Sequence, residues 1–391
     1  MKFASSLWPD PRNYSPKRLF CLDLLRGLDM FYLAVLAPFL NWRVLELHRH
    51  LPSTPEWVKI FFNHNQSAFA PAATGFGLFD FGQPLFLFVC GAAVPLALPK
   101  RLTPDGRPTA AYWKHLAGRL AMLTFFACLN RDLLTFDLGR FMPQSDTMLV
   151  IAAAYLGAAL SILIRNMKIR FALPFGILAA YWAIQQFGGD YTETGNINVR
   201  IDAAVFGGLG SAISWFASAR TYAFLLTTLA FAAVAMFGAL TVDYLKTERP
   251  AWTKARTLAV AGVLFFVAGR ATVPWIPPIR QIYTLSFVLM TTGLSILCLD
   301  VLYVLTDILR KRRGTGLFLL FGSFSLFTWE TANFFYPAVE TMAKRFSAGM
   351  PVLLGTDALQ SVIIGIWEMA LVTAAVICRY RMSLARPADR G

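Results

Sequence analysis

Residues 18–31 read Arg-Leu-Phe-Cys-Leu-Asp-Leu-Leu-Arg-Gly-Leu-Asp-Met-Phe, and they open a hydrophobic stretch that continues to about Trp42. Asp23, Arg26 and Asp29 follow one another at intervals of three residues, so in a helix they share one face within two turns. A charged side chain at the centre of a bilayer costs roughly 2.5–3.5 kcal/mol on insertion scales. The cluster is therefore either a topological anchor with a local ion pair or part of a polar site. Its position at a helix entrance favours the anchor.

The composition is that of a membrane protein. Hydrophobic residues make up 57% of the 391 and charged residues only 15%, whereas an average soluble domain has about 25% charged residues. Apolar stretches of about 20 residues alternate with basic loops, which is typical of a polytopic helical protein. The net charge of +14 is explained by loops that face an anionic lipid surface, so we expect membrane lipid and no nucleic acid as a partner. The five cysteines show neither disulfide nor metal-ligand spacing, and we expect no metal.

The hydropathy pattern predicts an all-α, multi-pass protein of the inner (plasma) membrane with about ten transmembrane helices. The expected spans are 19–41, 77–98, 117–135, 146–164, 171–187, 220–244, 257–273, 282–305, 317–337 and 358–378. With the N-terminus placed in the cytoplasm, 24 of the 36 lysine and arginine residues fall in segments expected on the inside. The pattern therefore predicts cytoplasmic tails at 1–18 and 379–391 on either side of one membrane domain at 19–378. The first apolar run is long enough to stay as a helix, and no cleavable signal peptide is expected.

The long outer loop between the first two expected spans carries His64. A solvated histidine usually has no special role, and His48 with His50 lacks a third ligand for a metal. Asp80 stands at the outer mouth of the second span. It is either a helix N-terminal acid that satisfies free amides or a functional carboxylate within the membrane.

Four segments resemble motifs of the heparan-α-glucosaminide N-acetyltransferase family and its bacterial relatives. Residues 18–31 resemble the opening R-x-x-S-L-D-x-x-R-G signature, and residues 80–95 resemble D-L-I-F-P-x-F-L-F-x-x-G-x-x-x-P. Residues 195–202 are similar to G-N-x-x-x-x-I-D, and residues 280–287 are similar to K-x-L-W-T-x-S-F. The four come in the family's order and cover most of the chain. Each alone is a weak signal.

The resemblance implies a membrane-embedded acyltransferase that takes acetyl-CoA from the cytoplasm and delivers the acetyl group to an amino sugar or other glycan on the far side. His64 matches the family's key histidine, and with Asp80 it is the expected catalytic pair. A histidine suits either general-base catalysis or a transient acetyl-imidazole. The remaining expected site residues form two groups. For the acceptor they are Asn196, Asp202, Arg280 and Asn41, and for acetyl-CoA they are Asp23, Arg26, Asp29, Arg119 and Lys114. Arg119 and Lys114 are explained equally well as ordinary basic residues that anchor the helix on the cytoplasmic side.

Several positions depart from the family's pattern. His64 and Asp80 lie sixteen residues apart instead of about ten, and Ala37 stands where the family carries an asparagine or acid, with Asn41 one turn further on. The chain is then either an acetyltransferase with another acceptor or a relative that no longer transfers acetyl groups. A transporter of sugars or amino sugars and a non-catalytic envelope protein stay open as alternatives, since buried charges also fit them. A homodimer is also open, although no G-x-x-x-G motif dominates.

Overall fold

The computed structural model describes residues 8–11, 14, 18–44, 77–131, 133–136, 146–206, 223–350 and 359–385. Every regular element within these ranges is a helix, and one isolated bridge between Leu102 and Pro108 closes a turn. The predicted all-α class is confirmed. His64 lies outside the described residues, as does the rest of the outer loop from residue 45 to residue 76.

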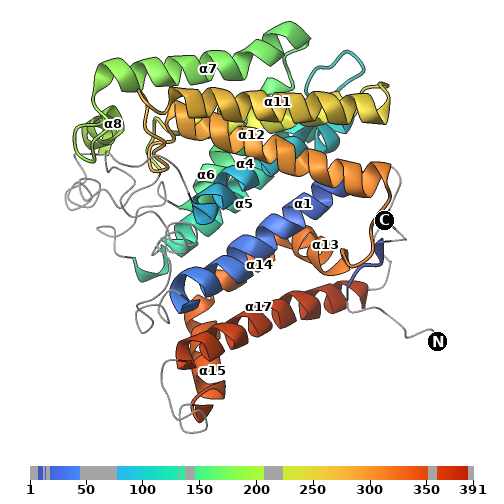
Figure 1. Ribbon diagram of the computed structural model, residues 1–391, viewed down its shortest axis with the longest axis vertical. Coiled ribbons are helices and arrows are strands. Elements are labelled where there is room, and N and C mark those ends of the chain that lie inside the picture. Colours follow the sequence, from blue (N-terminus) through green and yellow to red (C-terminus); the bar gives the residue numbers. More distant parts are fainter. Residues whose placement is uncertain are drawn as a thin grey trace. The chain divides into compact units, whose positions relative to one another are not determined.

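Contacts divide the chain into two compact units that alternate along the sequence. The first unit takes the described residues of 1–65, 77–83 and 301–391, and the second takes those of 84–300. The helices of the first unit are α1 (Phe20–Phe31), η2 (Tyr32–Leu36), η3 (Phe39–Val44), the first turn of α4 (Leu78–Ala97), η8 (Val304–Ile308), α13 (Gly316–Ser323), α14 (Ser325–Ala332), α15 (Tyr336–Phe346) and α17 (Gln360–Leu384) (Figure 1). The second unit holds the rest of α4, η4 (Pro99–Arg101), α5 (Ala110–Asn130), η5 (Leu133–Thr135), α6 (Thr147–Ser161), α7 (Met167–Gly188), α8 (Ile197–Phe206), α10 (Thr228–Leu245), α11 (Ala251–Thr272) and most of α12 (Leu285–Tyr303).

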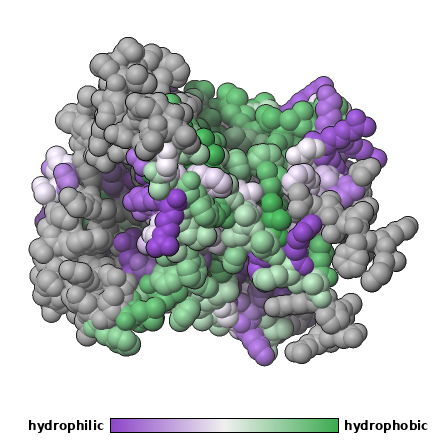
Figure 2. All heavy atoms as spheres, turned by 90° about the horizontal axis from the view of Figure 1, so that it is seen from below, coloured by the Kyte–Doolittle hydropathy of each residue, from purple (hydrophilic) through white to green (hydrophobic). Residues whose placement is uncertain are grey.

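Within the described ranges, six helices are long and apolar enough to cross a membrane. They are Asp80–Ala97, Met167–Gly188, Thr228–Leu245, Ala251–Thr272, Leu285–Ile308 and Gln360–Leu384, and each overlaps one of the ten predicted spans. The predicted span at 146–164 appears as the shorter apolar helix α6. Large apolar side chains on α11 are exposed along one face, among them Val260, Leu264 and Val267. Figure 2 shows broad apolar areas of surface with hydrophilic residues gathered in separate patches, which suits a multi-pass protein surrounded by lipid.

The first predicted span is one continuous helix from Phe20 to Val44, but two stretches of it have π geometry. Pro38 lies between them. Proline has no N–H and its ring clashes with the carbonyl four residues earlier, so a regular α-helix is disfavoured here. Short π segments occur frequently at functional sites, and η2 begins at Tyr32, one turn after Asp29.

Several predicted spans differ from the helices observed; for example, α10 begins eight residues after its predicted start and α17 ends six residues after its predicted end. The stretch 317–337 is not one helix: α13 ends at Ser323 and α14 begins at Ser325, with Phe324 between them at φ −118° and ψ 35°. The third helix begins at Ala110, seven residues before the predicted start, because the Thr109 side chain accepts a hydrogen bond from the Tyr112 N–H and caps it. Lys114 and His115, which precede the predicted span at 117–135, therefore lie in α5.

Close backbone approaches explain several glycines. In the first unit, a Cβ on Gly27 would lie 1.8 Å from the carbonyl oxygen of Phe318, and a Cβ on Gly322 would lie 2.7 Å from the carbonyl oxygen of Asp23. Helices α1 and α13 thus cross almost backbone to backbone. Such crossings at small residues are the common way for helices to associate in membranes, where lipid removes the hydrophobic driving force.

Candidate functional site

The most unusual side chain of the described structure is Asp29 on α1. It is only 2% exposed, and neither of its carboxylate oxygens has a hydrogen-bond partner. A buried carboxylate without a partner is strongly disfavoured, all the more within a helix that is expected to cross the membrane. Such a residue persists for a functional reason more often than for a structural one.

Tyr32 connects Asp29 to Asp80. The phenol lies one turn after Asp29 and interacts electrostatically with both carboxylates. A Cβ on Gly82 would lie 3.2 Å from the Tyr32 ring carbon Cε1, so the first turn of α4 passes directly over this ring. The Asp29–Tyr32–Asp80 cluster therefore combines two residues that were predicted from separate motifs with one that was not predicted.

Asp80 also has a structural role. The Gly77 N–H donates to Asp80 Oδ2 at 3.2 Å, and the Asp80 N–H donates to the Gly77 carbonyl oxygen at 3.2 Å. This reciprocal pair closes the first turn of α4, as a helix N-terminal acid does. The side chain is 3% exposed. The two predicted roles of Asp80, helix acid and functional carboxylate, are thus compatible in one residue.

Asp23 and Arg26, by contrast, form a compensated ion pair near the start of α1. Asp23 accepts from Arg26 Nη2 at 2.8 Å and from Arg18 Nη2 at 2.8 Å, and the Tyr14 hydroxyl also donates to it. The N–H of Cys21 donates to Asp307 Oδ2 at 2.9 Å, which satisfies one free amide of the helix start. The three charges that share a face in the sequence therefore separate into an anchored pair and the lone Asp29.

In the second unit, Asn196 is fully occupied as a helix cap. Its Oδ1 accepts from the Val199 N–H at 3.1 Å, and its Nδ2 donates to the carbonyl oxygens of Thr192 at 2.9 Å and Glu193 at 3.0 Å. Its amide is thus engaged in holding the start of α8. Acceptor binding is not needed to explain this asparagine.

Asp202 lies one helical turn beyond Asn198 on α8 and is fully buried. Its Oδ1 accepts from the Leu225 N–H at 3.0 Å, whereas its buried Oδ2 has no partner. Burial raises the pKa of Asp202 to about 6, and the hydrogen bond from Leu225 offsets part of that effect. Asp202 therefore keeps a free acceptor that Asn196 lacks.

A buried amide network near Asp202 was missed by the sequence analysis. The Tyr181 hydroxyl and the Gln185 side-chain amide both donate to the Ile282 carbonyl oxygen, at 2.5 and 2.8 Å, and Gln185 also donates to Tyr181 Oη at 2.7 Å. Asn198 Oδ1 lies 3.3 Å from the same hydroxyl. These bonds join α7, α8 and the turn before α12, where Arg280 lies partly exposed. Asn198 stands inside a quoted motif, but nothing in the sequence links it to Tyr181.

The two basic candidates for coenzyme binding, Lys114 and Arg119, both lie on α5. Lys114 is exposed, and the Arg119 guanidinium lies over the Tyr155 ring at 4.9 Å from its centroid. Partial burial lowers the pKa of His115 between them, and the nearby charges of Arg101, Arg119 and Lys100 lower it further. These residues form a positive patch on the second unit, in keeping with either predicted role.

A second buried charge network, also missed from the sequence, lies at the far end of the first helix. Arg43 in η3 donates to Glu368 at 2.5 and 3.1 Å and to Glu340 at 3.1 Å, and the Tyr336 hydroxyl donates to Glu368 at 3.1 Å. Partial burial raises the pKa of Glu340, but bonds from Lys344 and Arg43 outweigh this and hold it below its ordinary value. Asn41 lies in the same π segment, and its side chain is not described.

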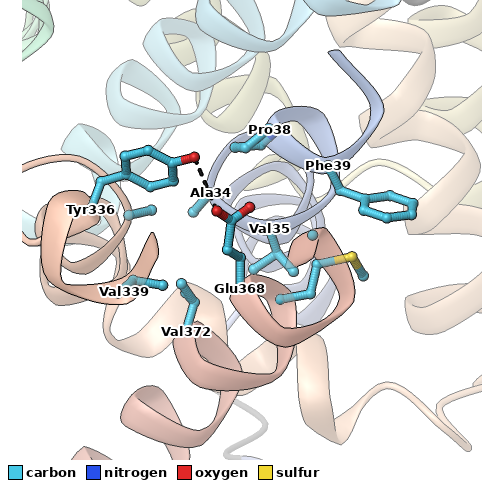
Figure 3. Close-up of a pocket in the computed structure, with 11 residues that line it drawn as sticks. Ala34, Val35, Pro38, Phe39, Tyr336, Val339, Glu368 and Val372 are labelled. Carbon is cyan, nitrogen blue, oxygen red and sulfur yellow. Dashed lines mark hydrogen bonds between the residues drawn. The ribbon is translucent and has the colours of Figure 1, made fainter. Parts of the chain in front are cut away.

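Figure 3 shows the pocket beside this network, with the Tyr336 hydroxyl hydrogen-bonded to Glu368 and an apolar lining that includes Ala34, Val35 and Val372. Its interior has room for about one water molecule. A pocket of this size suits a structural water and is too small for a sugar or a coenzyme. We therefore assign the Arg43–Glu368 network to the stability of the first unit.

Among the described residues, no group of three or more histidine, cysteine, aspartate or glutamate side chains is arranged to hold a metal ion. Comparison of the sequence with protein-family models and with curated proteins gives no match. The candidate site is therefore defined by the chain's own residues, with the Asp29–Tyr32–Asp80 cluster at its centre.

Proposed function

We propose that the chain is a transmembrane acyltransferase of the inner membrane, which moves an acetyl group from cytoplasmic acetyl-CoA to an amino sugar or glycan on the far side. The observation that supports it best is the Asp29–Tyr32–Asp80 cluster, with its uncompensated buried carboxylate. The outer loop that carries His64 lies between Tyr32 and Asp80 in the sequence, and Asp80 follows it by four residues. The resemblance of residues 18–31 and 80–95 to acetyltransferase motifs supports the same proposal, since each contributes one carboxylate to the cluster.

The chemistry needs the kinds of group that this cluster offers. With an amine acceptor, a new C–N bond forms, the thioester C–S bond breaks, and the proton lost by the amine passes through a base to the departing thiolate. His64 is the proposed base or acetyl carrier. An amino sugar arrives as an ammonium ion and loses one proton to solvent before the neutral amine attacks the thioester. Asp80 supplies negative charge near it and Asp29 supplies free acceptor oxygens, so Asp29 is proposed here for the acceptor and not for acetyl-CoA, as its sequence motif suggested.

The topology that this function needs has ten spans and two cytoplasmic termini. The helices added to the six long apolar ones are the Phe20–Val44 helix, α5, α6 and the α13–α14 pair. Both ends of the chain then lie with the donor, as the distribution of lysine and arginine predicts.

The proposal is tested by acetyl-CoA binding and CoA release with glucosamine as acceptor, using protein purified in detergent. We expect His64→Ala to lower the rate of CoA release by about 10²–10⁴-fold, the range of general acid–base catalysis. Asp29→Asn and Asp80→Asn should lower it as well, whereas Asp105→Asn, at an exposed loop position, is the matched control. Wild-type protein that neither binds acetyl-CoA nor releases CoA would exclude the acyltransferase. Full activity of His64→Ala and Asp80→Ala would favour a non-catalytic role for these residues.

The interrupted helix α13–α14 favours a transporter of sugars or amino sugars as the second candidate. Transporters bind substrates at helices broken within the membrane, where free backbone groups face the site. The break at Phe324 and the buried Glu330 of α14 fit that pattern. Uptake of labelled glucosamine into proteoliposomes without acetyl-CoA would support the transporter. Uptake that depends on acetyl-CoA and yields acetylated sugar would support the enzyme.

A further inference from the structure

The loop between η8 and α13 carries four consecutive cations, Arg310, Lys311, Arg312 and Arg313. Arg312 orders this loop: its guanidinium lies 4.4 Å from the centroid of the Phe20 ring, and its Nε donates to the Thr306 carbonyl oxygen at 2.9 Å. The Thr315 hydroxyl donates to the Arg312 carbonyl oxygen at 2.8 Å. The loop is therefore fixed against the start of α1 by the one cation that points inward.

The other three cations, Arg310, Lys311 and Arg313, are exposed, and none of them forms an ion pair within the described structure. Three arginines of the same unit, by contrast, are compensated. Arg18 and Arg26 pair with Asp23, and Arg43 pairs with two glutamates. Three cations within four residues repel one another, and a bound anion relieves that repulsion.

A helix N-terminus adds to the positive field of this loop. Helix α13 begins at Gly316, directly after the cations, and its N-cap residue Thr315 makes no side-chain bond to the first turn. Free N–H groups at a helix start favour an anion, and a phosphate is the usual one. Gly316 itself is buried against the Trp8 indole and the Pro9 carbonyl oxygen, so the helix start adds to the positive field of the loop without a direct contact at Gly316.

We propose that Arg310, Lys311 and Arg313 form a binding site for a ligand that carries several phosphate groups. Planar guanidinium groups bind phosphate oxygens in pairs, and a lysine adds a point charge. Two sources share this chemistry: the phosphates of coenzyme A and the headgroups of anionic phospholipids. The coenzyme source rests on the proposed acyltransferase function, whereas the lipid source does not.

The site can be tested by the triple variant R310Q/K311Q/R313Q, whose substitutions are all at exposed positions. The matched control is R165Q/K168Q/R256Q, which removes the same charge from exposed positions of the second unit. Binding of coenzyme A is measured in detergent by thermophoresis. Stabilisation by phosphatidylglycerol is measured by thermal unfolding in nanodiscs, against nanodiscs of phosphatidylcholine alone.

For a coenzyme site, the patch variant should bind coenzyme A at least about tenfold more weakly than wild type, and the control should not change. Wild-type affinity should fall with added salt, because exposed charges are screened. For a lipid site, the patch variant alone should lose the stabilisation by phosphatidylglycerol. That loss would support the site even if wild-type protein bound no coenzyme A. Failure of the wild-type protein to bind coenzyme A would remove the donor of the proposed reaction. Unchanged binding of both ligands by the patch variant would overturn the site and leave the acyltransferase proposal standing.

Discussion

At the scale of single residues, two buried carboxylates of the first unit have opposite surroundings. Glu368 accepts hydrogen bonds from Arg43 and Tyr336, whereas Asp29 accepts none. An unsatisfied buried polar group costs about 1–3 kcal/mol, and more when it is charged. We therefore expect Asp29→Asn to raise the unfolding midpoint by about 2–4 °C while the rate of CoA release falls, as scanning fluorimetry and the release assay can measure. A variant that is both less stable and fully active would show that Asp29 is a packing residue.

Removing one partner of the Arg43–Glu368 pair should have the reverse effect. Arg43→Met leaves Glu368 charged and buried, and the expected loss is about 3–5 kcal/mol of unfolding free energy. Arg43→Met combined with Glu368→Leu should lose much less, because no charge is left without a partner. Denaturant titration of the single and double variants measures the difference. A double variant less stable than Arg43→Met alone would mean that the two side chains act separately.

Asp202 should make the stability of the protein depend on pH. The pKa is about 6 in the folded state against an ordinary 3.8, so the folded state binds the proton more tightly than the unfolded state does. The stabilisation is complete below pH 3.8 and is lost as the pH rises to about 6, a change of about 3 kcal/mol. Asp202→Asn keeps an acceptor for the Leu225 N–H and should remove this dependence. Unfolding midpoints between pH 4.5 and 8 test it, with Asp105→Asn as control. Parallel wild-type and Asp202→Asn curves would rule Asp202 out as the titrating group.

At the scale of helices, the crossing of α1 and α13 leaves no room for a side chain. Gly27→Ala would place a methyl group 1.8 Å from the Phe318 carbonyl oxygen, and backbone cannot move aside as a flexible side chain can. We expect a loss of at least about 2 kcal/mol. Gly118→Ala on α5 is the matched control: nothing lies within 4 Å of the added methyl group, and alanine favours the helix by up to about 1 kcal/mol. Equal unfolding midpoints for the two variants would show that the crossing can relax.

The same helices show which features of the fold could be predicted from the sequence. Long apolar runs predicted the membrane helices, because in lipid every backbone group must be bonded within the helix. The break at Phe324 was missed because the apolar stretches before Ser323 and after Ser325 together have the length of one span. The start of α5 was missed because Lys114 and His115 suggested a loop, although Thr109 is a good N-cap residue.

For the site, Asp29 and Asp80 were named from local motifs. The pairing of Arg43 with Glu368 spans over 300 residues and leaves no pattern in a single sequence.

At the scale of the whole molecule, the number of spans depends on the α13–α14 pair. Each helix has eight residues and is about 12 Å long, so only the two together approach the roughly 30 Å of the hydrocarbon core. In the proposed topology the pair spans the membrane, which gives ten crossings and two cytoplasmic termini. If both helices enter and leave by the same side, the number of crossings is odd and the C-terminus is outside.

Reporter fusions distinguish these two topologies. We expect a fluorescent protein fused after Gly391 to be fluorescent, because it folds in the cytoplasm, and alkaline phosphatase fused after Thr192 to be active, because it folds outside. Phosphatase fused after Pro250, between α10 and α11, is the inactive control. Active phosphatase at the C-terminus with an unchanged signal at Thr192 would make α13–α14 a re-entrant pair. Since a re-entrant pair with a buried Glu330 would line a polar cavity, that result would favour the transporter over the acyltransferase.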